Sequence, residues 1–173
     1  MFGNKVNTDN EKIEELLSRR IEKVYPSKEE VEKKLKEGKR LRVYLGIDPT
    51  GPDLHLGHTI PLLFLKQLLE LGHKPVLVIG DFTARKGDPT DKESARQPLT
   101  EGEIKNNMKN YLGQVHKIIP KGSFDVEYNS SWLSKMSFGD ILNLASHVTV
   151  QQMSAREMFQ ERIRNQKPIG VHE

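Results

Sequence analysis

The 173-residue chain contains no cysteine, and this absence excludes several kinds of chemistry at once. A chain without thiols forms no disulfide bonds, binds no metal through thiolates and has no cysteine nucleophile. The composition fits a reducing compartment, so we expect a cytoplasmic protein. The N-terminal residues Met1–Lys12 contain no apolar core segment, and no secretory signal is visible there.

Long apolar runs and a large charge surplus are also lacking. The longest strongly apolar run, Ile60–Leu71, is interrupted by Lys66, Gln67 and Glu70. It is shorter than the roughly 20 residues that a membrane helix needs, so we expect no membrane contact. Lys and Arg number 27 against 24 Asp and Glu, and a net charge of +3 is too small to indicate nucleic-acid binding by itself. The composition is typical of one soluble globular domain.

Residues 1–39 are predicted to form a charged helical lead-in. The pair Thr8 and Glu11 and the pair Ser27 and Glu30 each predict a capping box at the start of an amphipathic helix. The dense Lys and Glu content of this segment is typical of a solvated helix face rather than of a binding patch.

Strand and helix signals alternate beyond the lead-in. The runs 41–47 and 75–79 predict strands, and the apolar helix between them ends near Gly72. This order predicts a βαβ unit with parallel strands. The run 124–128 predicts a further short strand, and 137–163 predicts helices in several pieces. The sequence therefore predicts an α/β fold with fewer strands than the five or six that are about usual for a doubly wound sheet, so we expect a truncated architecture.

The tetrapeptide His55-Leu56-Gly57-His58 is the first candidate site, because it follows a strand and opens the next helix. A helix N-terminus attracts phosphate through its N–H groups and its dipole, and imidazoles add hydrogen-bond donors. Gly57 would let a nucleotide approach the backbone. Two other interpretations stay open. Asp53, His55 and His58 could ligate zinc, although their spacing matches no standard site, or the histidines could be incidental to a helix start.

The residues around this tetrapeptide carry a family resemblance. The stretch Tyr44–His58 resembles the ATP-binding signature of class I aminoacyl-tRNA synthetases, in its tyrosyl form. The segment Ile79–Arg96 resembles the second conserved loop of that family. The run Asn129–Leu133 and the run His147–Glu173 are also similar to its bacterial members, so the resemblance covers residues 40–173.

The resemblance implies a fold and an activity. The fold would be a Rossmann-like parallel sheet of the class I synthetase type with a helical insertion, of which residues 40–173 form the N-terminal portion. The activity would be that of a tyrosine–tRNA ligase, which activates L-tyrosine with ATP and Mg²⁺ and transfers it to tRNA(Tyr). The complete enzyme would be a homodimer. Such chemistry depends mainly on positioning and charge stabilisation rather than on covalent catalysis.

The resemblance also assigns roles to individual residues, and it assigns none to a metal site. The side chains expected to contact the ATP phosphates are Thr50, His55, His58, Lys92 and Arg96. The residues expected to shape the nucleotide bed are Gly46, Asp48 and Gly57, together with Thr50, His55 and His58. The residues expected to bind tyrosine are Tyr44, Asp88, Asn129 and Trp132, with the Asp88 carboxylate holding the ammonium group.

Several features of the family are missing from the sequence. A downstream Tyr-x-x-x-Gln-x-x-Asp pattern, a Lys-Met-Ser-Lys-Ser-type loop and tRNA-binding domains are not found, and Lys135-Met136-Ser137 is only a partial string. Thr90-Asp91 replaces a common Ser-Gly pair, and Leu45 stands where some members have cysteine. We therefore expect an incomplete catalytic domain. The alternatives are a small-molecule nucleotidyltransferase with the same His-x-Gly-His fold and a non-catalytic nucleotide-binding module.

Overall fold

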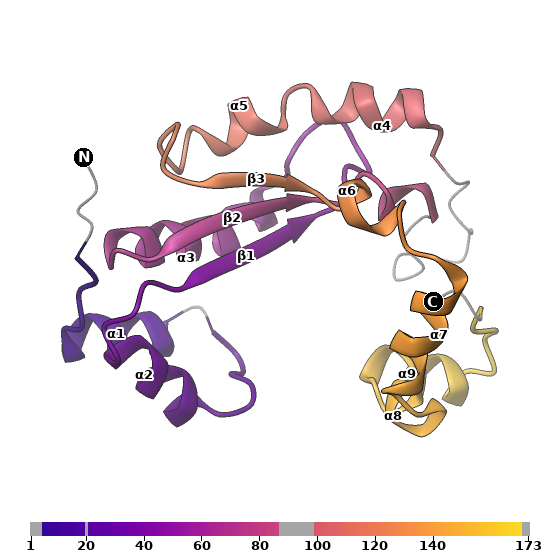
Figure 1. The fold of residues 1–173 in the computed structure, drawn as a ribbon, viewed down its shortest axis with the longest axis horizontal. Coiled ribbons are helices and arrows are strands. Elements are labelled where there is room, and N and C mark those ends of the chain that lie inside the picture. The colour runs from indigo at the N-terminus through magenta and orange to yellow at the C-terminus, as the bar shows by residue number, and fades with distance from the viewer. Residues whose placement is uncertain (1–4, 20, 87–98, 171–173) are drawn as a thin grey trace.

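The computed structural model describes residues 5–19, 21–86 and 99–170, and a parallel sheet lies at its centre (Figure 1). The strands are β1 (Arg42–Ile47), β2 (Lys74–Ile79) and β3 (Asp125–Tyr128), arranged in the order β1-β2-β3. Both pairings are parallel. The predicted α/β fold with a parallel sheet is confirmed, including its third strand.

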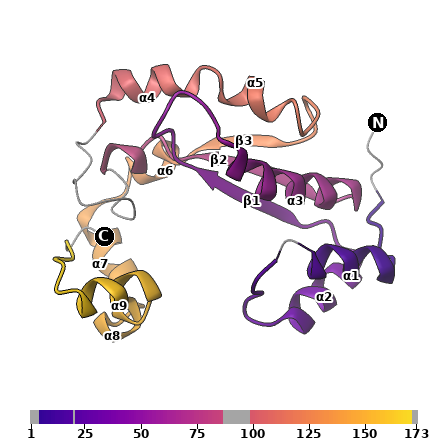
Figure 2. The same cartoon turned by 180° about the vertical axis from the view of Figure 1, so that it is seen from behind.

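Helices surround this sheet on one face and at both ends. Those before β3 are α1 (Asn10–Ser18), α2 (Lys28–Lys36), α3 (Thr59–Glu70), α4 (Glu101–Met108) and α5 (Tyr111–Val115). Those after it are α6 (Ser130–Leu133), α7 (Phe138–Ser146), α8 (Val150–Ser154) and α9 (Glu157–Arg164). Figures 1 and 2 show α3 along one face of the sheet, α1 and α2 near the start of the strands, and α7–α9 beyond their carboxyl ends. In the described ranges, no helix has the length and apolar character needed to cross a bilayer.

The main hydrophobic core lies between the sheet and the helices on one of its faces. Leu77 and Ile79 of β2 are buried there against α3 and α5. Alternate residues of a strand point to opposite faces, so the residues between them point to the other side of the sheet. The helical side chains buried in this cluster are Ile13, Leu16, Leu17, Leu35, Leu62, Leu65, Leu68, Leu69, Tyr111 and Val115. The lead-in helices α1 and α2 thus contribute to the same core as α3.

The helices of the lead-in begin at local side-chain caps. Ser27 is confirmed as a cap, since its hydroxyl accepts the N–H of Glu30 at 3.2 Å. The expected cap at Thr8 is wrong, because the Asp9 carboxylate accepts the N–H of Lys12 at 3.0 Å and α1 begins one residue later. A carboxylate also complements the positive end of the helix dipole, which a hydroxyl does not.

Candidate functional site

The turn His55–His58 connects the loop after β1 to α3. Residues Leu56–His58 form a short 3-10 turn that continues directly into α3. The N–H of Gly57 donates to His55 Nδ1 at 3.1 Å, and the N–H of His55 donates to His58 Nδ1 at 3.2 Å. The two imidazole rings lie against each other, with centroids 3.9 Å apart.

These two hydrogen bonds fix the tautomer of both rings. A backbone N–H can only donate, so each Nδ1 accepts and carries no proton. In a neutral imidazole the proton then resides on Nε2, which leaves each ring one N–H donor for a ligand. Burial lowers the pKa of His58, and the neighbouring His55 lowers it further, so the neutral ring is favoured. The turn therefore presents two adjacent N–H donors to an anionic oxygen.

The backbone N–H groups of this turn are used within it. Besides the bond from Gly57 to the His55 ring, the N–H of His58 donates to the His55 carbonyl at 3.0 Å, and the N–H of Thr59 donates to the Leu56 carbonyl. Free N–H groups are expected at a helix start, but the His55 ring accepts one of these three and the 3-10 turn uses the other two. The imidazole Nε2–H groups are the donors that the turn offers instead.

Two glycines leave room for side chains of the site itself. A Cβ on Gly57 would lie 2.9 Å from Cε1 of the His55 ring. A Cβ on Gly80, which follows β2, would lie 1.6 Å from Asp48 Oδ1 and 2.6 Å from Thr83 Oγ1. Both positions therefore require glycine for the observed positions of the His55 ring and the Asp48 carboxylate.

A chain of hydrogen bonds joins the carboxyl ends of the three strands. The hydroxyl of Thr83 donates to Asp48 Oδ1 at 2.8 Å, and Asn129 Nδ2 donates to Thr83 Oγ1 at 3.0 Å. Asn129 Oδ1 accepts the N–H of Phe82 at 2.8 Å. Asn129 is only 7% exposed, so its side chain supports this edge of the sheet from within. Ligands of open α/β sheets bind at such carboxyl ends.

A slot of about 380 Å³ opens on the face of the sheet that α3 does not cover. Val76 and Val78 form its apolar floor, and Tyr44 and Trp132 stand beside them with 75% and 43% of their surface exposed. At its other end the Arg42 guanidinium pairs with the Glu127 carboxylate at 3.4 Å. An apolar slot between aromatic side chains suits a flat ring.

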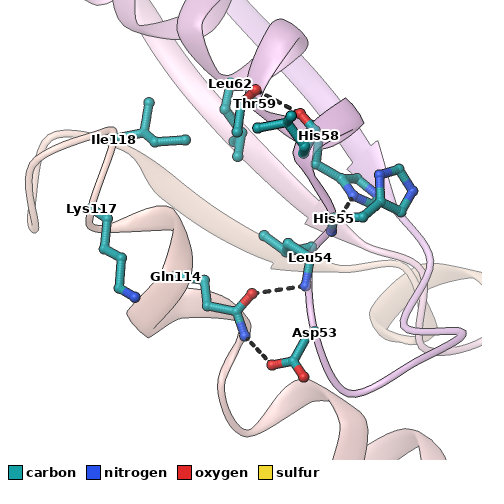
Figure 3. Close-up of a pocket in the computed structure, with 10 residues that line it drawn as sticks. Asp53, Leu54, His55, His58, Thr59, Leu62, Gln114, Lys117 and Ile118 are labelled. Atoms are coloured by element: carbon teal, nitrogen blue, oxygen red, sulfur yellow. Dashed lines mark hydrogen bonds between the residues drawn. The ribbon is translucent and has the colours of Figure 1, made fainter.

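A second pocket, of about 540 Å³, lies beside the turn His55–His58 (Figure 3). Its walls are residues of the turn and the start of α3 on one side and Gln114, Lys117 and Ile118 on the other. In Figure 3 the two imidazole rings lie on the opposite side of Leu54 from Gln114 and Lys117. The histidine pair is therefore part of one wall of this pocket.

The zinc interpretation of Asp53, His55 and His58 finds no support in this geometry. The Asp53 carboxylate accepts a hydrogen bond from Gln114 Nε2 at 2.7 Å, and Nδ1 of each ring accepts a backbone N–H. Within the described ranges, no three His, Cys, Asp or Glu side chains are grouped to hold a metal ion.

The structure brings some of the predicted site residues together. His55 contacts His58, Asp48 is linked to Asn129 through Thr83, and Tyr44 lies with Trp132 at the slot.

The remaining predicted residues differ in what the structure says of them. Gly46 is exposed on β1, and Thr50 is exposed with its N–H donating to the Asp48 carbonyl at 2.8 Å. Asp88, Lys92 and Arg96 lie outside the described residues.

No sequence pattern predicted the polar side chains of α4 and α5 that reach the loop of residues 49–54. Asn107 Nδ2 donates to the Pro49 carbonyl at 3.0 Å, and the Tyr111 hydroxyl donates to the Gly51 carbonyl at 2.7 Å. Gln114 bonds to the same loop. For Gln114 the signal is its spacing, three residues after Tyr111 in α5, which places a polar group next to a buried one on the same helix.

Comparison with known proteins places the chain among the tRNA synthetases. Residues 36–173 match the model of the family described as tRNA synthetases class I (W and Y). The chain is 46% identical over 162 residues to the tyrosine–tRNA ligase of Carboxydothermus hydrogenoformans, covering 92% of this chain and 39% of that ligase. It is also 46% identical over 168 residues to the ligase of Trichormus variabilis, covering 91% and 42%. The chain thus spans about two fifths of the length of these relatives.

Solved structures share the fold. A C-terminally truncated mitochondrial tyrosyl-tRNA synthetase of Aspergillus nidulans superposes with a TM-score of 0.74 at 23% identity, covering 92% of this chain and 49% of that one. The family match extends over the sheet and the paired histidines at the carboxyl end of β1. On this evidence, the chain belongs to the family of class I tRNA synthetases that comprises the W and Y enzymes.

Proposed function

We propose that this chain forms the ATP-binding part and one side of the amino-acid pocket of a tyrosine–tRNA ligase. In this reaction the carboxylate of L-tyrosine attacks the α-phosphorus of ATP and pyrophosphate leaves. The tyrosyl group then passes from the adenylate to tRNA(Tyr). The observation that carries the proposal is the pair of imidazoles at His55 and His58, whose tautomers leave two adjacent Nε2–H donors. We place the reaction in the cytoplasm, where its substrates occur together.

The imidazole pair would act on the phosphates of ATP. Charge builds on the pyrophosphate oxygens as the α-phosphorus bond breaks, and donors already in position stabilise that charge without reorganisation. By their places in the motif, Thr50 would donate to the γ-phosphate and Gly46, Asp48 and Gly57 would border the nucleotide. Mg²⁺ would enter as the counter-ion of the ATP substrate.

The slot on the uncovered face would take the side chain of tyrosine. Its apolar floor of Val76 and Val78 matches the faces of an aromatic ring, and the Tyr44 hydroxyl is a group that can hydrogen-bond a phenol. The names of the relatives support tyrosine as the amino acid, since those compared above are tyrosine–tRNA ligases.

Three further roles rest on the sequence motif. Asp88 would bind the ammonium group of tyrosine, and Lys92 and Arg96 would neutralise pyrophosphate as it leaves. In the complete enzyme, Asp88→Asn should therefore raise KM for tyrosine much more than KM for ATP. Equal increases would mean that Asp88 is a turn residue.

We also propose that the complete enzyme works as a homodimer. Large apolar side chains of α7 and α8, among them Phe138, Leu144 and Val150, are 74%, 63% and 78% exposed, which supports a protein contact at this end of the chain. Analytical ultracentrifugation of the complete enzyme across a concentration series should show a dimer. A monomer at every concentration would contradict this proposal.

A chimaera tests the activity directly. Residues 1–173 replace the matching segment of the Carboxydothermus hydrogenoformans ligase, and ATP–pyrophosphate exchange is measured with and without L-tyrosine. Exchange that depends on tyrosine supports the proposal. Exchange that needs no amino acid would favour a small-molecule nucleotidyltransferase, and ATP binding without exchange would favour a non-catalytic module.

The histidine pair is tested in the same chimaera. Removal of a donor that stabilises transition-state charge lowers kcat by about 10²–10³, so His55→Ala combined with His58→Ala should lower the exchange rate at least this much. The matched control is His147→Ala, an exposed histidine at the end of α7. An unchanged rate in the double variant would remove the imidazoles from the mechanism.

A further inference from the structure

Three side chains of α4 and α5 hold the loop that precedes the signature turn. Asn107 donates to the carbonyl of Pro49, Tyr111 donates to the carbonyl of Gly51, and Gln114 bonds to residues 53 and 54. The helices and the loop are about 60 residues apart in sequence. The helices fix the loop along most of its length.

Gln114 makes two hydrogen bonds to this loop, one as acceptor and one as donor. Its Oε1 accepts the N–H of Leu54 at 2.7 Å, and its Nε2 donates to Asp53 Oδ1 at 2.7 Å. One amide therefore satisfies a donor and an acceptor that lie directly before His55. Neither Glu nor Leu at this position can do both, because a carboxylate cannot donate to Asp53 and an alkyl group forms no hydrogen bond.

Tyr111 anchors the middle of the same loop. Its side chain is 3% exposed and its hydroxyl reaches the Gly51 carbonyl at 2.7 Å. Burial raises the pKa of this phenol, and the Asp53 and Asp48 carboxylates add to the rise, so the hydroxyl keeps the proton that it donates. The loop is thus held by a buried neutral donor as well as by Gln114.

We infer that Asn107, Tyr111 and Gln114 are positioning residues for the ATP site, and that Gln114 sets the position of the imidazole pair by fixing Asp53 and Leu54. Leu54 is bonded directly to His55, whose N–H donates to the His58 ring. A shift of Leu54 therefore moves the amide that orients His58. Small displacements of positioned groups are costly, since donors act only at the place where charge develops. This inference rests on the proposed function, because it takes the imidazole pair as the ATP site.

Moving the carboxylate from Asp53 to position 114 tests the inference in the 173-residue chain. The measured quantity is the dissociation constant for ATP, by calorimetric titration of the folded protein. Gln114→Glu places a second carboxylate against Asp53, so the dissociation constant should rise about tenfold, the scale of one hydrogen bond to a charged group. Adding Asp53→Asn restores a donor opposite the new carboxylate and should bring the value back to within about threefold of the wild type.

Gln151→Glu is the matched control, because it makes the same chemical change at an exposed position of α8. It should leave the ATP dissociation constant unchanged. A purely structural role for Gln114 would lower the free energy of unfolding but would not change the affinity of the folded chain. The inference is overturned if Gln114→Glu binds ATP as the wild type does, or if the double variant shows no rescue.

A second measurement separates this inference from the proposed function. Gln114→Leu removes the acceptor of the Leu54 N–H, so hydrogen exchange of that amide should become about tenfold faster, as expected for a lost hydrogen bond. This readout needs no ATP. If the wild-type chain binds no ATP, the proposed function fails while the exchange rate still reports on the contact. Unchanged exchange at Leu54 would overturn the role of Gln114 whatever the chain binds.

Discussion

Leu77 of β2 and Leu144 of α7 are the same residue type in regular secondary structure, yet their exposed fractions are 1% and 63%. Leu77 lies in a core that receives side chains from α1, α2, α3 and α5. Within α7 no residue is buried, and in α8 and α9 together Phe159 is the only buried one. Both regions consist of regular secondary structure, but only the sheet region packs into a hydrophobic core.

The comparison separates local from tertiary determinants of structure. Helices α7 and α8 begin with full capping boxes, Ser137 with Asp140 and Thr149 with Gln152. Such boxes satisfy the first N–H groups of a helix without any contact from elsewhere in the chain. The sheet has no such local source of stability, because its hydrogen bonds join residues far apart in sequence. Its strands form only with the core that covers them.

The largest effect is expected from a matched pair of leucine substitutions. Leu77→Ala should lower the free energy of unfolding by about 2–5 kcal/mol, because it leaves a cavity in the core. At protein concentrations where the chain is monomeric, Leu144→Ala should change it by less than about 0.5 kcal/mol, as for other exposed positions. Urea titration followed by circular dichroism measures both. Equal losses would mean that the apolar face of α7 is buried in solution.

Gly80 gives the next largest effect. In Gly80→Ala the new methyl would overlap the Asp48 carboxylate, and such overpacking costs about 1–3 kcal/mol. Gly102→Ala in α4 is the control, since a Cβ there meets no atom within 4 Å, and it should be neutral or slightly stabilising. The same denaturation experiment compares them. A neutral Gly80→Ala would show that the strand ends rearrange freely.

The buried His73 makes the stability of the sheet region depend on pH. The residue is fully buried, its Nδ1 accepts the N–H of Leu41 at 3.3 Å, and burial, followed by the charge of Arg40, lowers its pKa. The folded chain therefore binds this proton less well than the unfolded chain does. The contribution of His73 to the free energy of unfolding should be fully present above about pH 6.5 and should decline as the pH falls below that value.

Unfolding free energies at pH 5 and pH 7 measure this dependence. His73→Asn keeps an acceptor for the Leu41 N–H but does not titrate in this range, so its stability should fall less between the two pH values. The same decline in both proteins would mean that other groups cause it. A chemical-shift titration of His73 in the wild-type chain gives the direction of its pKa shift independently.

The smallest effect is expected at the start of α7. Hydrogen bonds from the Ser137 hydroxyl and backbone lower the pKa of Asp140. In Ser137→Ala this pKa should rise, and amide exchange in the first turn of α7 should become faster, while the denaturation midpoint of the sheet region should stay unchanged. Ser131→Ala in α6 is the control. A shift of the main unfolding transition would show that α7 folds cooperatively with the sheet.

The sequence determined those parts of the fold whose signals are local. Ser27 predicted a helix start correctly, because a cap needs only the next three residues. The runs around Leu45, Leu77 and Val126 predicted strands that the structure confirms, since each run matches the pattern of one strand. The stretch around His55 and His58 similarly pointed to the family, because the motif is contiguous.

Tertiary structure decided the contacts between residues that are distant in sequence. The hydrogen bonds that link Asp48, Thr83 and Asn129 depend on the order of the strands. The bonds of Gln114 to Asp53 and Leu54 depend on where α5 packs. The tautomers of the imidazoles also depend on the turn that backbone geometry imposes. A linear pattern records which donors and acceptors are present, but only the packed chain determines which of them meet, because each partner is chosen by the core that brings the elements together.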